Sequence, residues 1–150
     1  MLNLIKILFF ILTLAGLQMA AQNKNHLFEP AKAGLTEYKA LYVLNESDET
    51  KIKGVIRNIS NAMDDPRLKG KLYVELLVFG PGVELYRKKN GYDKLLIPLT
   101  EWGVIFVQCE NTLKEKNIPK ADLYDFVRYT PSGSGEIILR QYEGWAVVKP

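Results

Sequence analysis

The sequence alternates between short apolar runs and segments with the apolar spacing of a helix, and this alternation constrains its fold most. Pro66 ends one helical segment, whose single apolar stripe is formed by Ile52, Val55, Ile56, Ile59 and Met63. A nearly unbroken apolar run, residues 72–79, follows it. Such a run is typical of a parallel strand that is covered on both faces.

Five runs of this kind predict strands, at residues 38–44, 72–79, 104–107, 126–129 and 145–148. Further helical segments are predicted around residues 95–99, 110–116 and 132–142, the last with Ile137, Ile138 and Gln141 on its inner side. Helices between strands imply crossover connections and therefore a parallel sheet. The predicted fold class is α/β, a three-layer α/β/α sandwich with a five-stranded, mainly parallel sheet.

The first 21 residues have the layout of a secretory signal peptide. Lys6 precedes an apolar run, residues 7–17, that is too short to span a bilayer, and small residues Ala20 and Ala21 follow. We expect cleavage there, no stable membrane span afterwards, and export to the periplasm or secretion; an uncleaved anchor is the alternative. Residues 22–37 are predicted to form an arm and residues 38–150 the domain.

Composition narrows the classes of function. The chain has 20 basic and 17 acidic residues and a formal net charge of +3, which is too balanced for a nucleic-acid surface. Its single cysteine excludes an intramolecular disulfide, and its single histidine leaves no zinc site in view, so no metal is expected. No cofactor is expected either, since the glycines match neither a dinucleotide fingerprint nor a P-loop.

Ligands of open α/β sheets bind at the carboxyl ends of the strands. Three segments reach that edge here: Gly80-Pro81-Gly82, the segment around Cys109, and Ser132-Gly133-Ser134. The two glycine-containing segments are candidates for binding a small anionic ligand through backbone amides. Each also has an ordinary structural reading, a turn at Gly80-Pro81-Gly82 and a helix N-cap at Ser132.

Cys109 ends the third apolar run and precedes a predicted helix. Unpaired amides at a helix N-terminus favour a thiolate, so Cys109 is a candidate nucleophile or sulfur carrier. The adjacent Glu110 opposes this, and no base lies nearby in the sequence. The alternative is that Cys109 is a small buried apolar residue that continues the strand.

Glu75 lies within an apolar strand, where an unpaired buried carboxylate would be costly. We therefore expect it to face a sheet edge or a subunit interface; a role as general base is the weaker alternative.

Three blocks together carry a resemblance to a known family: Val78-Phe79-Gly80-Pro81-Gly82-Val83, then Gly103–Phe106 leading to Cys109-Glu110-Asn111-Thr112-Leu113, then Arg140-Gln141-Tyr142-Glu143-Gly144-Trp145-Ala146. In order and spacing they resemble the DsrE/DsrF-like family over residues 38–150. The resemblance implies a three-layer α/β sandwich that assembles as a homotrimer or hexamer. It also implies that Cys109 carries sulfur as a persulfide between donor and acceptor proteins, with Asn111 and Thr112 shaping the site.

Two hypotheses of function follow. The first is an exported thiol protein in which Cys109 accepts, carries or senses sulfur or oxidant. The second is a non-catalytic, oligomeric binding module for a small anionic ligand or a protein partner. A nucleophile without a base or an oxyanion partner does not make a self-sufficient enzyme, so a sulfur carrier or a binding protein is favoured.

Overall fold

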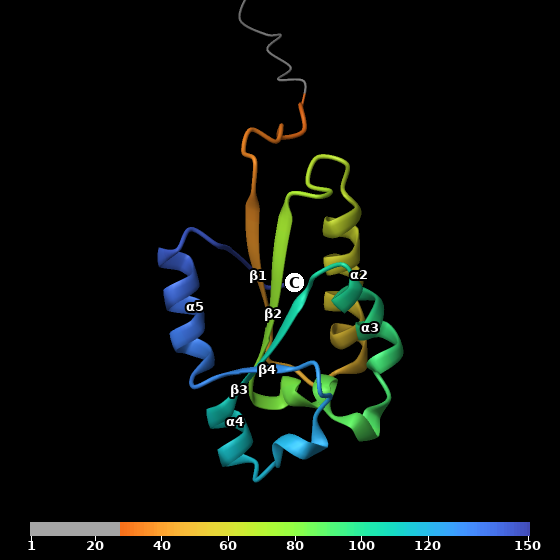
Figure 1. The fold of residues 1–150 in the computed structure, drawn as a ribbon, viewed down its shortest axis with the longest axis vertical. Helices are drawn as coiled ribbons and strands as arrows, with labels where there is room; N and C mark the ends of the chain where they lie inside the picture. The colour runs from red at the N-terminus through yellow and green to blue at the C-terminus, as the bar shows by residue number, and fades with distance from the viewer. Residues whose placement is uncertain (1–27) are drawn as a thin grey trace, which may run out of the picture. The chain divides into compact units, whose positions relative to one another are not determined.

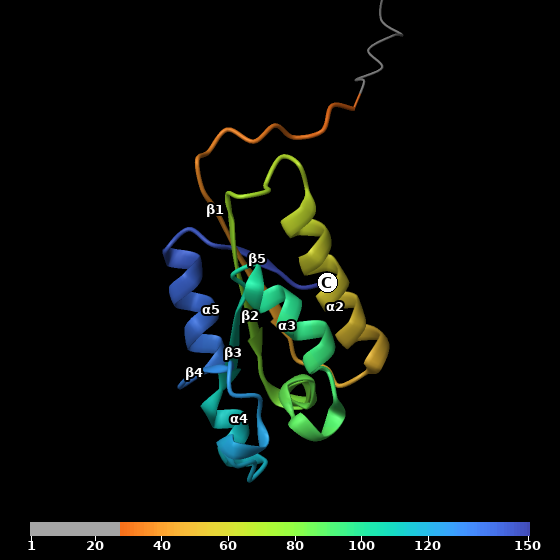
Figure 2. The same cartoon turned by 45° about the vertical axis from the view of Figure 1, so that its right-hand side comes forward.

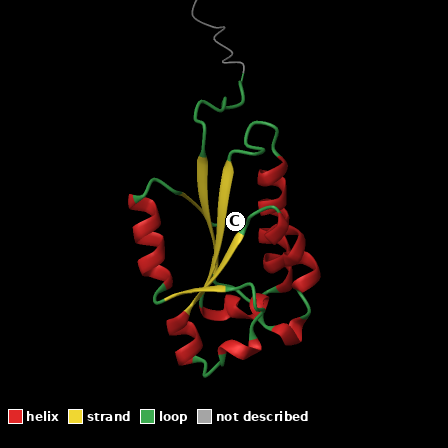
Figure 3. Ribbon diagram, in the orientation of Figure 1, coloured by secondary structure: helices red, strands yellow, loops and turns green. Residues whose placement is uncertain are grey.

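The computed structural model describes residues 28–150, and residues 33–150 form one unit of the chain. The predicted signal peptide, and the arm up to residue 27, lie outside the described residues. Five strands form one sheet in the order β4-β3-β2-β1-β5, and every neighbouring pair is parallel. Their bounds are β1 (Tyr38–Leu44), β2 (Leu72–Val78), β3 (Ile105–Cys109), β4 (Arg128–Thr130) and β5 (Ala146–Val148). The predicted five-stranded parallel α/β sandwich is confirmed (Figure 3).

Helices lie on both sides of the sheet (Figures 1 and 2). Helices α2 (Glu49–Asp64) and α3 (Asp93–Glu101) cover one face, α5 (Gly133–Tyr142) covers the other, and the short α4 (Glu110–Glu115) follows β3 directly. The 3-10 helices are η1 (Gly80–Tyr86), η2 (Lys88–Asn90) and η3 (Lys120–Asp122). None of the helices in residues 28–150 has the length and apolar character to cross a membrane.

Helix α2 forms as its sequence predicts. The Asp48 side chain caps it by accepting a hydrogen bond from the Lys51 amide at 3.0 Å. Its buried residues are Ile52, Val55, Ile56 and Ile59, the stripe expected from the spacing. Backbone beyond Asp64 turns away from helical geometry just before Pro66.

The two faces of the sheet differ in how much core they carry. On the α2 side, Leu76 and Phe106 belong to a cluster of 22 buried residues in the described part of the chain. On the α5 side, the buried cluster consists of Leu41, Val43, Leu77 and Val107. Adjacent strand residues point to opposite faces, so neighbours such as Leu76 and Leu77 enter different cores.

Several details differ from the sequence-based predictions. Strand β4 begins two residues later than predicted, and Gly80-Pro81-Gly82 opens the 3-10 helix η1 instead of a simple turn. On α5, Ile138 is 54% exposed and Gln141 is exposed too, so only Ile137 of the predicted inner side packs toward the sheet. Arg140, which a hydrophobic pattern passes over, takes the inner position because it binds Glu75.

The expectation that Glu75 faces a sheet edge or an interface is wrong. Strand β2 lies in the middle of the sheet, and the Glu75 side chain is fully buried. Arg140 reaches it from α5 and donates hydrogen bonds from its guanidinium at 2.8 Å and 3.0 Å. Burial raises the pKa of Glu75, and the nearby Arg140 opposes that rise. A distant basic partner, hidden from local sequence patterns, is what permits this carboxylate in the core.

Candidate functional site

Cys109 is the last residue of β3 and the N-cap of α4, at the carboxyl edge of the sheet. Its side chain is 5% exposed. Strand alternation places it on the same face as Val107, the face that α5 covers. The thiol is therefore a nearly buried group at the place where ligands of parallel sheets bind.

A backbone amide contacts the sulfur of Cys109. Gly133, the first residue of α5, donates its N–H to Cys109 Sγ across 3.2 Å. A side chain at Gly133 would place its Cβ 3.0 Å from the Phe79 ring, so glycine is what lets α5 approach this closely. The sulfur thus accepts a hydrogen bond from an amide at a helix N-terminus, the end of a helix at which anions bind.

The three predicted segments meet around this sulfur in a shallow pocket of about 220 Å³. Its lining consists of Phe79, Gly80, Cys109, Asn111, Thr112, Glu115, Ser132, Gly133 and Ser134. Seven of the nine predicted site residues are in this lining. The other two lie elsewhere: Pro81 is exposed, and Gly82 is buried where a Cβ would approach the Leu44 carbonyl oxygen to 2.6 Å.

Hydrogen bonds fix the loops around the pocket. The buried Thr112 Oγ1 accepts a hydrogen bond from the Gly80 N–H at 2.8 Å, which joins α4 to the loop after β2. Gly80 has a positive φ of 53°, a conformation that favours glycine. Ser132 Oγ accepts from the Gly135 N–H at 3.2 Å and so caps α5, as its ordinary structural reading predicts. Asn111 is exposed at the rim.

The charges near the pocket are acidic. Glu115 is the one charged residue in the lining. Glu110, next to Cys109 in the sequence, bonds to Lys120, and this hydrogen bond lowers the pKa of Glu110. With no histidine, lysine or arginine in the lining, the pocket offers a nucleophile and an amide donor but no cationic group for an anionic ligand.

Sequence reasoning missed two lining residues, Phe79 and Glu115. Glu115 lies four residues after Asn111, so helical spacing places the two on the same face and would have found it. Phe79 follows the last residue of β2 and was included in the predicted strand. Its ring packs against Gly133, a contact between distant segments that no local pattern shows.

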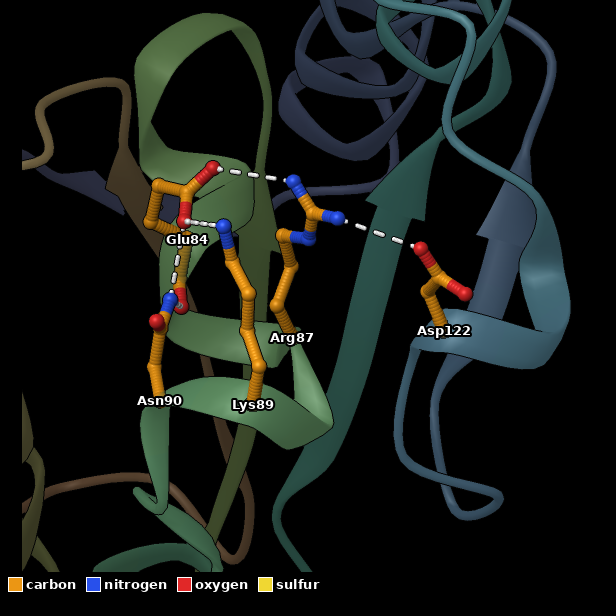
Figure 4. A network of polar contacts seen from close by, with 5 residues as sticks. All are labelled: Glu84, Arg87, Lys89, Asn90 and Asp122. Carbon is orange, nitrogen blue, oxygen red and sulfur yellow. Dashed lines mark hydrogen bonds and ion pairs between the residues drawn. The ribbon is translucent and has the colours of Figure 1, made fainter.

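In a second polar cluster, both cations, Arg87 and Lys89, are paired with carboxylates and so are not free to bind an anionic ligand (Figure 4). Arg87 pairs with Asp122 at 3.1 Å and with Glu84 at 3.6 Å, and Lys89 lies 3.7 Å from Glu84. The Asn90 amide donates to Glu84 at 2.8 Å. Burial alone would raise the pKa of Glu84, but the Asn90 hydrogen bond and the two cations lower it. This cluster joins η1 and η2 to η3.

Within residues 28–150, no three His, Cys, Asp or Glu side chains lie close enough together to hold a metal ion.

The fold and the site define a class: a parallel α/β sandwich with one thiol at the carboxyl edge, under the N-terminus of a helix. Among solved structures, the chain is similar to the protein of unknown function MTH1491 from Methanobacterium thermoautotrophicum. The two are 32% identical, the alignment covers 76% of this chain and 100% of that one, and the TM-score is 0.71. The chain belongs to the same family as MTH1491.

Two more distant structures share the fold. The ychN protein from E. coli is 14% identical, with a TM-score of 0.58 over 77% of this chain and 100% of its own. BT1422 from Bacteroides thetaiotaomicron, a conserved protein of unknown function, is 12% identical, with a TM-score of 0.57 over 81% of this chain and 100% of its own. No family model and no curated protein sequence matches the chain.

Proposed function

We propose that this chain is an exported, DsrE/DsrF-like thiol protein that carries sulfur as a persulfide on Cys109. The observation that carries the proposal is the hydrogen bond from the Gly133 N–H to Cys109 Sγ, at 3.2 Å, inside a pocket open to solvent. The leader at residues 1–21 supports export, to the periplasm or out of the cell.

The proposed transfer needs no oxidant. The Cys109 thiolate attacks the outer sulfur of a donor persulfide, a new S–S bond forms on Cys109, and the donor leaves as a thiolate. In the second step an acceptor thiolate attacks the outer sulfur on Cys109, and Cys109 itself leaves as a thiolate. The Gly133 amide stabilises that departing charge. The thiolate forms when the Cys109 thiol loses its proton to solvent through the open pocket, and neither transfer step after that moves a proton.

The resemblance also supports a homotrimer or hexamer, with a protein as sulfur donor or acceptor, and we include both in the proposal. A binding module for a small anionic ligand is the second candidate, because a nucleophile without a complete catalytic set does not make an enzyme. The acidic Glu115 in the lining weighs against an anion.

The test is to treat the native protein with a low-molecular-weight persulfide and to measure the intact mass. We expect a gain of about 32 Da, one sulfur atom, that a reductant removes. Cys109→Ser should show no gain. A wild-type protein whose mass stays unchanged would contradict the carrier role. A thermal shift by thiosulfate or phosphate that survives Cys109→Ser would favour the binding module.

A matched pair of variants isolates the amide. Gly133→Ala and Gly133→Pro both add a Cβ beside Phe79, but only proline removes the N–H. Proline is tolerated at the first position of a helix, so α5 should still form. A hydrogen bond to a charged group contributes roughly 1.5 kcal/mol, so we expect release of sulfur to an acceptor thiol to be about tenfold slower for the proline variant than for the alanine variant. Equal rates would mean that the amide takes no part.

A further inference from the structure

The α5 side of the sheet exposes an unusual share of apolar side chains. Beyond residue 37, nine large apolar side chains of the described chain are exposed, and six of them are on α5 or on the strand faces beneath it. These six are Tyr73, Ile105, Ile138, Leu139, Tyr142 and Val147. Clustered exposed apolar surface marks an interaction site more often than scattered residues do.

Three of these residues form a ridge on the outer side of α5. Ile138, Leu139 and Tyr142 are separated by one and three positions, so they share one side of the helix. Their exposed fractions are 54%, 62% and 90%. Ile137 and Arg140 point the other way, toward the sheet. The helix thus has an apolar side that its own chain does not use.

Beside the ridge lies a strip of sheet that α5 leaves uncovered. Tyr73 on β2 and Ile105 on β3 are 54% and 47% exposed, although Leu77 and Val107, further along the same faces, are buried. Arg128 on β4 extends the strip, since it pairs in register with Val107. Its side chain is exposed and makes no ion pair or hydrogen bond with residues 28–150.

The ridge and the strip border one another. Ile105 lies beside Glu75 in the register of β2 and β3, and Arg140 of α5 binds Glu75 at 2.8 Å. Leu139, the neighbour of Arg140, therefore emerges next to the uncovered strands. A protruding apolar helix and a flat apolar strip on the same side of one molecule have complementary shapes.

We propose that the ridge of one copy packs on the strip of a second copy of this chain. Parallel sheets are normally covered by helices on both faces, so the cover missing over Tyr73 and Ile105 is a helix. This chain supplies a helix with an unused apolar side, and each copy offers both halves of the contact. The charges agree: Glu143, 55% exposed, follows the ridge and shares Arg140 with Glu75 and Glu136, so three carboxylates face one guanidinium there. Arg128, an exposed cation, lies in the strip.

Such a contact closes as a reciprocal pair or as a ring. The inference rests on the homo-oligomer of the proposed function, and it is independent of the thiol chemistry. It places the contact on the α5 side of the sheet, and none of the contact residues lines the Cys109 pocket.

The test is the mass of the purified protein in solution, measured by light scattering at tens of micromolar. Wild type is expected to be an oligomer. Tyr142→Arg, in the ridge, and Ile105→Lys, in the strip, are each expected to give monomers. Ile97→Lys is the matched control, because Ile97 is 45% exposed on α3, on the opposite side of the sheet, and should leave the oligomer intact. Mixing the two monomeric variants restores one intact ridge and one intact strip, so a heterodimer is expected.

Tyr142 is 90% exposed, so its replacement leaves monomer folding undisturbed, and circular dichroism checks this for every variant. A monomeric wild type would overturn both the homo-oligomer and this surface, while the persulfide assay would still report on Cys109. An oligomer that survives both Tyr142→Arg and Ile105→Lys would overturn the surface alone. Dissociation by the Ile97→Lys control would also overturn it, since the effect would then be general.

Discussion

The two faces of the sheet are built from the same strands but differ in what they bury. On the α2 side, two helices and η1 enclose a deep core around Leu76 and Phe106, and sequence spacing is enough to predict it. On the α5 side, a four-residue cluster, a buried ion pair and the Cys109 pocket share the space under one helix. The α2 side therefore holds most of the buried core, while the α5 side carries the groups that we propose contact other molecules.

Two adjacent residues of β2 allow the two faces to be compared directly, with the largest expected effect. Leu76 and Leu77 are both fully buried, the first on the α2 side and the second on the α5 side. Leu76→Ala is expected to lower the free energy of unfolding by about 4 kcal/mol, and Leu77→Ala by about 2.5 kcal/mol, because the thinner layer relaxes around the cavity more easily. Urea denaturation measures both, and equal losses would remove the distinction between the faces.

Loss of the buried ion pair between Arg140 and Glu75 is expected to have the next largest effect on stability. Arg140→Met keeps the length of the side chain but leaves the buried Glu75 carboxylate without its partner. We expect a loss of about 3 kcal/mol in the free energy of unfolding at neutral pH. Lys53→Met, which breaks an exposed pair with Glu49 on α2, is the control and should leave the free energy of unfolding nearly unchanged. A similar cost for both would show that Glu75 is solvated.

The pH dependence of Glu75 sharpens the same point. Because burial raises its pKa in the folded state, the stability contribution of this group is fully present below its unfolded pKa, near 4.5, and is lost as pH rises through the raised value. Glu75→Gln is neutral at every pH. The free energy of unfolding of the Glu75→Gln variant, relative to that of wild type, should therefore increase as pH rises from about 4.5 through the raised pKa of Glu75. The difference should be constant below and above this pH range. Denaturation between about pH 4 and pH 8 measures it; a difference that falls with rising pH would contradict the assigned direction.

The smallest effect on stability is expected from removing the N-caps of the helices on the two faces. Asp48 caps α2 and Ser132 caps α5. Each alanine variant is expected to cost about 1 kcal/mol in unfolding free energy. Only Ser132→Ala should also change the alkylation rate of Cys109, because the α5 N-terminus holds the Gly133 amide against the sulfur. An equal change from Asp48→Ala would indicate a global effect.

Local spacing was sufficient to predict the fold class. The stripe from Ile52 to Met63 and the run at residues 72–79 specify elements whose sides are set by short-range periodicity. The strand order was not predictable, because it depends on which strands pair across the sheet. Glu75 was misplaced for the same reason: its partner Arg140 is 65 residues away in the chain.

The site was predictable to the level of segments but not of contacts. The carboxyl ends of parallel strands lie at one edge of a sheet, so Gly80, Cys109 and Ser132 were predicted to lie together, and one pocket contains all three. The rule says nothing of orientation, so it also included Pro81, which points to solvent, and Gly82, which is needed for close packing against Leu44. The hydrogen bond from Gly133 to Cys109 depends on the position of α5, which Arg140 and Glu75 help to set.

The proposed function requires Cys109 to be a reactive thiol and not only a buried residue of the core. Alkylation of the native protein by a small reagent, compared with the same reaction after denaturation, tests it most directly. We expect Cys109 to be modified while the protein stays folded, since the residue lines an open pocket although its side chain is only 5% exposed. Modification that begins only when the protein unfolds would contradict it, and Cys109 would then be a buried apolar residue at the end of β3.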